Sequence, residues 1–495
     1  MNTRAPAVAK GQPSRGRSSG RSASFLRRTD ASEMFNDIVF VGLLLALAWV
    51  PFRFGSNHLL TWGINAVLFG LLLIAFELGL LASAKRHPVA PIRLWWAIAL
   101  FAGFVGWILF QMSPWSPEAW HNALWPMTRE IIGGIPEAAP AEGRISVTPD
   151  QGFLGLIRLL TCAAAFWLAL QLCRDRVRAE MFVLVLVGIA VAYAIYGILQ
   201  LMLFPNSLLW IVKPSYLDVV TSTFINRNSY ATYAGIGLIA SVGLLIETYR
   251  RSSVGRDAPF AHRLAAIVET TSRRGLPLIV AITIIAIALL LTVSRAGITA
   301  SLSGIVTLML LSVLLMRRQL ALGIVAVGVL VAMTGALMFY GDSFAERLVE
   351  AGGADLRFAV TQRTFEAALD EPWTGFGYGS FDRMFGLYRN TDSFVWAHWD
   401  KAHNTYVELL FELGFPATIA FVVLVVGLLA MCVANVLGRE SRPMLSLVAL
   451  AASVLVFMHA TVDFSLQIEA VAITYWMLFG AGLAQSWSRR IDTSI

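Results

Sequence analysis

Long uninterrupted runs of apolar residues are the feature that most restricts how this chain can fold. Only 14% of its 495 residues are charged, against roughly 25% in soluble domains, so a water-soluble globule is excluded. Because a membrane-crossing helix needs about 20 mainly apolar residues, we predict an all-α polytopic membrane protein with about 12 transmembrane helices. The predicted spans are about 38–52, 58–84, 94–112, 153–173, 179–205, 229–247, 276–293, 296–316, 320–340, 403–436, 443–461 and 466–486.

The positions of Lys and Arg residues indicate how the spans are oriented, because cytoplasmic loops carry an excess of them. With a cytoplasmic N-terminus, short basic loops such as 174–178 and 316–318 fall inside, and most of the 38 Lys and Arg residues lie on that side. The formal net charge of +7 then reflects topology and a basic tail. No nucleic-acid partner is therefore predicted.

Polar stretches divide the chain into four parts. They are a disordered basic cytoplasmic tail (1–37), N-terminal spans with an outer loop at 113–152 (38–220), later spans with an outer loop at 341–402 (221–486), and a cytoplasmic tail (487–495). The first tail is expected to contact anionic lipid, or to be solvated without a specific role. The larger outer loop is rich in aromatic residues, so we expect it to fold as a cap over the outer mouth of the bundle.

Polar residues collect where four predicted spans meet the outer side. The four islands are Thr221–Tyr230, Thr292–Gly297, Ala402–Tyr406 and His459–Phe464. They place Arg227, Arg295, His403 and Asp463 on one face of the membrane at similar depth. Charged groups at this depth are costly in hydrocarbon and usually face protein or a wet cavity.

Each of these residues also has a structural explanation when it is taken alone. A single Arg at a helix end often extends to lipid headgroups, and His403 or Asp463 could serve only as a helix cap. The run Gly375–Gly379 looks like a phosphate-binding loop, but it lacks the Lys-Ser/Thr pair and a preceding strand, so we interpret it as a tight turn.

Together the polar islands suit a lipid-linked diphosphate that arrives from the outer leaflet. Arginine binds phosphate oxygens in a bidentate manner, and the predicted helix start at His403-Asn404-Thr405 adds backbone donors. The sequence has no Asp-x-Asp pair, ATP-binding motif or His/Cys cluster with metal-ligand spacing. We therefore predict neither a metal nor another cofactor.

Four segments resemble the O-antigen ligase/O-antigen polymerase family of bacterial polysaccharide assembly. They are Thr223–Tyr230, Leu290–Gly297, Pro372–Gly379 and Ala402–Leu409, and the resemblance covers roughly 220–470. The ligase pattern has a His, then Asn, Ser or Gln, nine residues, Gly, two residues and Gly, Thr or Tyr. His403, Asn404 and Gly414 match this pattern, whereas Ala417 departs from its last position.

The resemblance implies a GT-C-like, metal-independent, inverting glycosyltransferase of the bacterial inner membrane with its active site facing the periplasm. It implies a donor glycan on undecaprenyl diphosphate and no cofactor. By position, Arg227 and Arg295 would bind the diphosphate and stabilise its departure, and His403 would hold phosphate or act as base. Further donor contacts would come from Asn404, Arg357 and Arg363, and acceptor or supporting contacts from Asp463, Tyr406 and Asn226.

Four functions remain open at this point, and one of them is a glycan-to-protein transferase of the same superfamily. An O-antigen ligase in lipopolysaccharide synthesis would transfer the glycan to lipid A-core, whereas a polymerase of O-antigen or exopolysaccharide would transfer it to a second lipid-linked glycan. A flippase or transporter of lipid-linked sugars is the alternative from another class. A transporter should carry broken or charged helices near the membrane midplane, whereas the polar sites here collect at one face.

Overall fold

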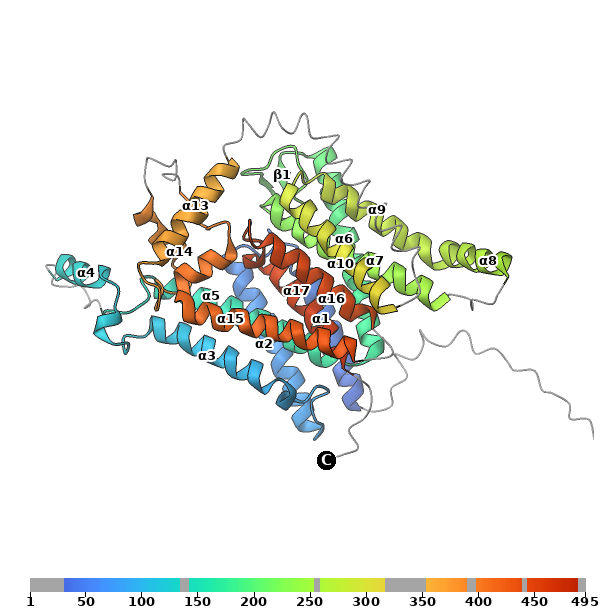
Figure 1. The fold of residues 1–495 in the computed structure, drawn as a ribbon, viewed down its shortest axis with the longest axis horizontal. Coiled ribbons are helices and arrows are strands. Elements are labelled where there is room, and N and C mark those ends of the chain that lie inside the picture. Colours follow the sequence, from blue (N-terminus) through green and yellow to red (C-terminus); the bar gives the residue numbers. More distant parts are fainter. Residues whose placement is uncertain are drawn as a thin grey trace, which may run out of the picture.

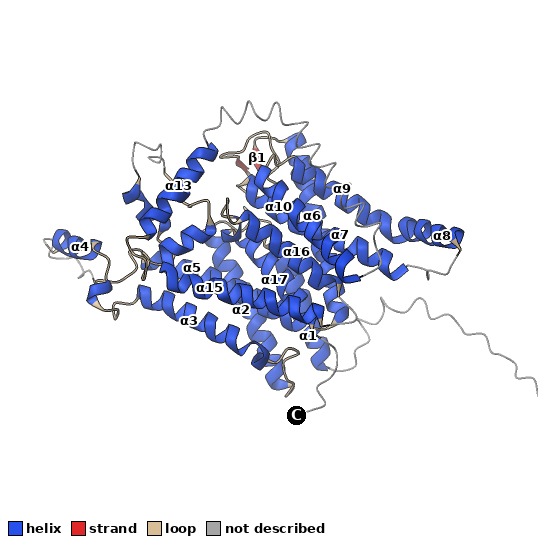
Figure 2. Ribbon diagram, in the orientation of Figure 1, coloured by secondary structure: helices blue, strands red, loops and turns tan. Residues whose placement is uncertain are grey.

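The computed structural model describes residues 31–133, 142–252, 259–316, 353–389, 398–438 and 443–487. These residues are almost all helical, and the strands β1 (Ser207–Leu208) and β2 (Ile211–Val212) form a small antiparallel hairpin (Figures 1 and 2). The long helices are α1 (Ala31–Trp49), α2 (Leu59–Ala82), α3 (Trp95–Met112), α5 (Pro149–Leu172), α6 (Arg176–Leu203), α7 (Arg227–Ser252), α9 (Leu276–Leu290), α10 (Arg295–Met316), α15 (Thr405–Leu437), α16 (Met444–His459) and α17 (Glu469–Ser486).

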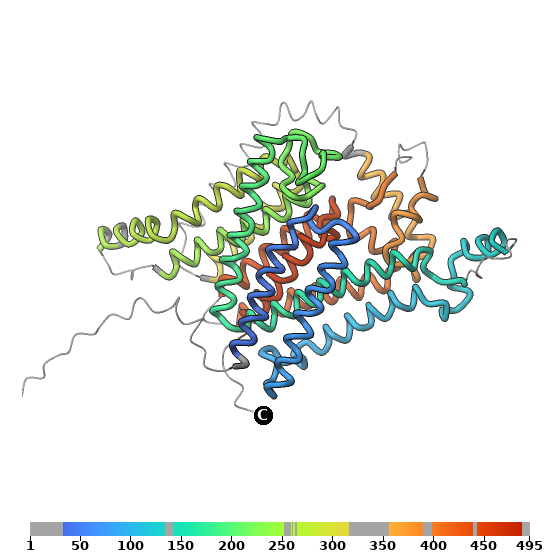
Figure 3. The backbone as a smooth tube through the Cα atoms, turned by 180° about the vertical axis from the view of Figure 1, so that it is seen from behind, coloured from blue at the N-terminus to red at the C-terminus, as the bar shows by residue number. Residues whose placement is uncertain are grey.

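Short elements connect the long helices. They are η1 (Pro91–Leu94), η2 (Glu118–Trp120), α4 (Leu124–Ile132), α8 (Phe260–Thr270), the π-helical turn η3 (Thr271–Gly275), α13 (Gly353–Ala368), α14 (Phe381–Met384), η4 (Phe385–Tyr388) and η5 (Ser465–Gln467). Figures 1 and 3 show α13 and α14 at one end of the helical bundle, and α8 projecting beyond the other.

The described residues confirm a helical, multi-pass membrane protein. Eight of their helices are long and apolar enough to cross a membrane, and α16 is a shorter apolar helix. The helices α1, α16 and α17 coincide with three further predicted spans. The predicted span at 320–340 lies outside the described residues, so the count of about 12 stays a prediction.

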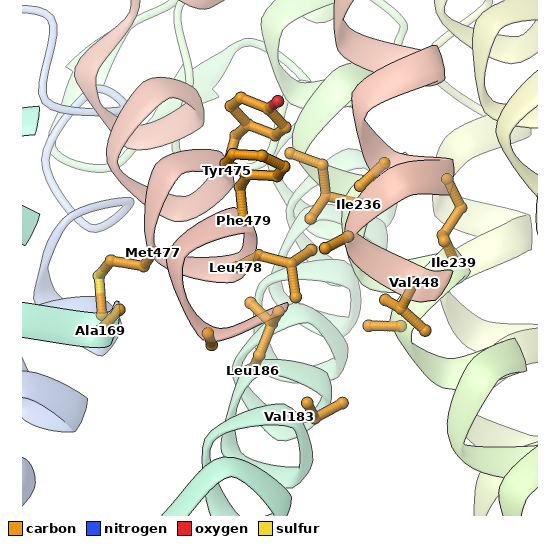
Figure 4. Packing of buried hydrophobic residues seen from close by; sticks show 14 of the residues in the cluster. Ala169, Val183, Leu186, Ile236, Ile239, Val448, Tyr475, Met477, Leu478 and Phe479 are labelled. Carbon is orange, nitrogen blue, oxygen red and sulfur yellow. The ribbon is translucent and has the colours of Figure 1, made fainter. Parts of the chain in front are cut away.

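The helix α17 lies in the centre of the bundle and packs against α5, α7 and α16. Figure 4 shows its Tyr475, Leu478 and Phe479 among apolar side chains of neighbouring helices, and all three are buried. A side chain at Gly482 would collide with Ala449 of α16. Small residues at such contacts let helices approach closely where lipid supplies no hydrophobic driving force.

The helix α15 breaks at Gly414, which has φ 76° and ψ 167°, and Pro416 follows two residues later. This backbone region is essentially restricted to glycine. Proline has no N–H to offer the carbonyl of Glu412, and the Phe415 N–H donates to the Pro372 carbonyl at 2.8 Å instead of continuing the helix. The predicted tenth span is therefore two helical segments that meet at Gly414.

The glycine-rich run binds the carbonyls that the break leaves open. The N–H groups of Phe376 and Gly377 donate to the carbonyls of Phe411 and Glu412 at 3.0 and 2.9 Å. From α3, the Gln111 side chain donates to the Glu412 carbonyl at 2.9 Å. A Cβ on Gly375, which has φ 63°, would lie 2.5 Å from the same carbonyl oxygen. The run is thus a tight turn that packs against a broken helix, as its sequence predicts.

The residues around this turn form a small hydrophobic core outside the main bundle. Val360 and Ala367 of α13 pack there with Phe381, Phe385 and Phe411. This core attaches 353–389, part of the predicted cap, to the first segment of α15. The remainder of the predicted cap, including 341–352 and 390–397, lies outside the described residues.

We expect Gly414→Ala to destabilise the protein by about 2–4 kcal/mol, through a disfavoured backbone conformation and a steric clash. The new Cβ would lie 2.6 Å from the Trp373 carbonyl oxygen. Thermal unfolding in detergent measures the effect, with Gly103→Ala as the control because its Cβ would meet no atom within 4 Å. Equal melting temperatures for the two variants would contradict the role of the break.

Candidate functional site

The four polar islands predicted from the sequence meet at one end of the bundle. Asp463, in the connection between α16 and α17, is fully buried. Its carboxylate accepts hydrogen bonds from Asn228 Nδ2 at 2.8 Å and Ser465 Oγ at 2.7 Å. Asn228 lies in the first turn of α7, and its Oδ1 accepts from Ser294 Oγ, just before α10, at 2.8 Å. Asp463 thus fixes three of the islands to one another.

The fourth island, at the start of α15, joins the same network through its backbone. The Thr405 N–H donates to the Ala460 carbonyl at 2.9 Å, and Thr405 Oγ1 donates to the Asp463 carbonyl at 3.3 Å. His403 and Asn404 are therefore held beside the connection between α16 and α17.

Three arginines from different helices gather near this network. The Arg227 guanidinium lies 5.4 Å from the centre of the Tyr216 ring, and its Nε is buried without a hydrogen-bond partner among the described residues. Arg295 and Arg357 both lie within electrostatic range of Arg227. Like charges this close repel one another, so the arrangement suits an anion that bridges them.

His403 lies within electrostatic range of both Arg357 and Asp463. Its ring packs edge-on against Trp399 and Phe464, with ring centres 5.5 and 5.0 Å away. Burial, followed by the positive charge of Arg357, lowers the pKa of His403 to about 4, although Asp463 acts in the opposite direction. The imidazole is therefore neutral at pH 7, and its Nδ1 is buried without a hydrogen-bond partner among the described residues.

The backbone of His403 is also unusual, because its φ of 54° lies in the left-handed region. Such conformations cost energy in non-glycine residues and occur often at functional sites. The next residue, Asn404, begins α15, where its Oδ1 accepts hydrogen bonds from the N–H groups of Tyr406 and Val407. The cap at Asn404 thus fixes the strained histidine at the helix N-terminus.

Two of the remaining predicted residues make structural contacts at the same end. Tyr406 donates its hydroxyl to the Phe457 carbonyl of α16 at 3.0 Å. Asn226 Oδ1 accepts from the Asn228 N–H at 2.7 Å and so caps α7. Both contacts order the helix starts that carry Arg227 and His403.

Arg363, on α13, makes its described contacts away from this arginine cluster. Its guanidinium pairs with Glu366 at 3.0 Å and donates to the Tyr388 carbonyl at 3.1 Å. These partners lie within 353–389 itself. Among the arginines of α13, Arg357 is therefore the one near Arg227 and His403.

Sequence reasoning missed two residues of the buried network, Asn228 and His459. His459 Nδ1 lies 2.6 Å from Thr232 Oγ1 and 3.3 Å from Ser465 Oγ, and its Nε2 is buried without a partner among the described residues. Both residues lie inside predicted polar islands, in which the predicted site residues were Arg227, Asn226 and Asp463. The sequence holds one signal for this network. Asn228 and Thr232, which contact Asp463 and His459, are one helical turn apart and therefore lie on the same face of α7.

The described residues contain no group of three or more His, Cys, Asp or Glu side chains arranged to hold a metal ion. The cluster at this end is built instead around three arginines. The site as described can bind an anion and present a neutral imidazole beside it.

Replacing Asn228 with Ala should destabilise the site. The change leaves the buried Asp463 oxygen and the Ser294 hydroxyl without their partner, which costs about 1–3 kcal/mol. Thermal unfolding in detergent measures the loss. Asn435→Ala is the matched control, since among the described residues that half-buried Asn donates a side-chain hydrogen bond to Ser486 Oγ alone, at 3.2 Å. The network has no stabilising role if both variants unfold alike.

A search of the curated proteins returns no match for this chain. The family model described as O-antigen ligase (Wzy_C) matches residues 279–422. The match includes Arg295, Arg357 and His403, together with the break at Gly414, whereas Arg227 and Asp463 lie outside it. Residues 279–422, which supply Arg295, Arg357 and His403 of the site, thus match the O-antigen ligase family.

Proposed function

We propose that this protein is a glycosyltransferase that moves a glycan from undecaprenyl diphosphate to lipid A-core at the periplasmic face of the bacterial inner membrane. The observation that carries the proposal is the cluster of Arg227, Arg295 and Arg357, the last of which lies within electrostatic range of a neutral His403. Arg295, Arg357 and His403 lie within the family match, and Arg227 and Arg295 begin the membrane helices α7 and α10. The family supports a role in polysaccharide assembly, and the cluster supplies a site for the diphosphate.

The donor diphosphate would bind among the arginines. Arg227 and Arg295 stand at the starts of α7 and α10, where helix dipoles also favour negative charge. Arg357 approaches from α13, and Asn404 lies at the start of α15. Because the diphosphate is already an activated leaving group, arginine charge alone stabilises its departure. Arg363 is the least favoured contact, since Glu366 already pairs with it.

The reaction would be a direct displacement with inversion at the anomeric carbon. The acceptor hydroxyl oxygen forms the new bond to that carbon, while the bond to the diphosphate oxygen breaks. Undecaprenyl diphosphate leaves with the electron pair, and His403, neutral at pH 7, accepts the hydroxyl proton. Asp463 would steady His403 by its charge, and Tyr406 and Asn226 would order the surrounding helix starts.

A polymerase that transfers to a second lipid-linked glycan is the second candidate. It is favoured by one observation, the departure of Ala417 from the ligase pattern. Ala417 follows the break in α15 and packs with Phe104 and Leu413. The diphosphate site would be the same for both reactions, and only the acceptor would differ.

The test uses purified protein, undecaprenyl-diphosphate glycan and EDTA, with lipid A-core in one reaction and donor alone in another. Transfer to lipid A-core with release of undecaprenyl diphosphate supports the ligase. Longer lipid-linked chains from donor alone would favour the polymerase. If folded protein releases no undecaprenyl diphosphate in either reaction, the glycosyltransferase proposal is overturned and the transporter hypothesis is favoured.

A further inference from the structure

A second charged site lies at the opposite end of the same helices. A cavity of about 450 Å³ opens between α6, α7, η3, α16 and α17. It involves Gly243–Arg251 of α7, whereas the diphosphate site uses Arg227 at the start of that helix. At 1.5 Å per residue the two sites are roughly 30 Å apart. The cavity is therefore separate from the proposed site of transfer.

Positive charge dominates the lining of this cavity. Arg176, Arg250, Arg251 and Arg274 line it, against two glutamates, Glu180 and Glu247. The glutamates hold part of the arginine cluster in place. Arg251 pairs with Glu180 at 2.7 Å and with Glu247 at 2.6 Å. Such pairs leave an excess of guanidinium charge in a preorganised arrangement, which favours a phosphate oxygen.

The start of α16 adds backbone donors to the same cavity. Pro443, Met444 and Leu445 line the cavity, and the residue that caps this helix, Pro443, supplies no side-chain hydrogen bond to it. The first N–H groups of a helix have no partner within the helix and attract anions. The arginines and the start of α16 are independent elements, and both favour an anionic ligand.

Apolar side chains also line the cavity. Val183 and Leu184 of α6, Leu244 of α7 and Val448 of α16 line it. A cavity with arginines at a helix end and apolar walls between membrane helices matches an amphiphile better than a soluble ion. Basic pockets between membrane helices bind the headgroups of anionic lipids.

We propose that this cavity binds the headgroup of an anionic phospholipid, with the phosphodiester among the arginines and the start of an acyl chain against Val183, Leu184 and Val448. The ligand chemistry is a phosphate ester, and the membrane is its source. Binding here does not depend on the reaction at the other end of the bundle.

The test measures binding of phosphatidylglycerol and phosphatidylcholine to the detergent-purified full chain by native mass spectrometry. Arg176→Gln/Arg274→Gln is the test variant, because Arg176 pairs only at the surface, with Glu180, and Arg274 is exposed. Each lost arginine weakens anionic lipid binding by about fivefold. We expect selective retention of phosphatidylglycerol by the wild type and a loss of at least about tenfold in the variant.

Arg273→Gln is the matched control, since Arg273 neighbours Arg274 on the same turn but does not line the cavity and pairs with Glu269. It should bind phosphatidylglycerol as the wild type does. Unchanged phosphatidylglycerol binding by the double variant, with a wild-type melting temperature, would overturn the proposal. So would equal retention of phosphatidylcholine, or displacement of the lipid by millimolar inorganic phosphate, which would identify a soluble-anion site instead.

Discussion

Replacing Arg227 with Ala is expected to lower kcat/KM for glycan transfer by about 10²–10³-fold, the usual loss when one donor to a developing anion is removed. The reason is that Arg227 has a buried Nε without a partner among the described residues and two further arginines within electrostatic range. Arg227→Lys should recover only part of the activity, because an ammonium group cannot bind two phosphate oxygens in the fork geometry of a guanidinium. Steady-state release of undecaprenyl diphosphate measures both variants.

Arg383→Gln supplies the control for this prediction. Arg383 is an exposed arginine of α14. Its substitution by Gln removes the same formal charge as Arg227→Ala. Its kcat/KM should stay within about twofold of the wild type, because exposed charges are strongly screened by water and salt. If Arg227→Ala kept wild-type activity while folded, the arginine cluster would not be the diphosphate site.

His403→Gln should lower transfer by about 10²–10⁴-fold, the usual range for loss of a general base. Because burial lowers the pKa of His403 to about 4, wild-type kcat/KM should show no His403 titration between pH 6 and 8. Its acidic limb should begin near pH 4 and be absent from the residual activity of the variant. A rate that rises as His403 becomes protonated would identify this residue as a phosphate ligand instead.

The same lowered pKa makes a prediction for folding. In the unfolded chain His403 takes up a proton near pH 6.5, whereas in the folded chain it does so near pH 4. The unfolded state therefore binds more protons in this window, and stability should fall as the pH falls from about 6.5 to about 4. His403→Gln should flatten that slope in thermal unfolding at several pH values. An identical slope in both proteins would exclude His403 as its source.

The helical membrane fold and the common face of the polar islands were predictable because both depend on local sequence. Apolar length identifies a span, and alternating orientation places the starts of α7, α10 and α15 at one end. Arg227, Arg295 and His403 are ionisable residues at such starts. Topology therefore places them on the same face of the membrane, whereas the structure brings them together.

The partners that organise the site were less predictable, because they are distant in sequence. Asn228 and Asp463 are 235 positions apart, and Gln111 reaches the Glu412 carbonyl across 301 positions. Nothing in the neighbourhood of Asn228 shows that it bonds to a carboxylate rather than to its own helix. Likewise the sequence contains Glu366 beside Arg363, but only the folded side chains show that they pair.

The break at Gly414 also divides α15 into a short segment next to the candidate site and a longer apolar segment. A straight helix of 33 residues would be about 50 Å long, against a hydrocarbon core of about 30 Å. The segment after the break, roughly 34 Å long, is close to that thickness. Because α15 is not continuous through Gly414, we expect tilting of this segment in a thicker or thinner membrane to leave the bonds from Thr405 to Ala460 and Asp463 in place. If the proposed function holds, we expect the geometry at His403 to be insulated from the thickness of the surrounding lipid.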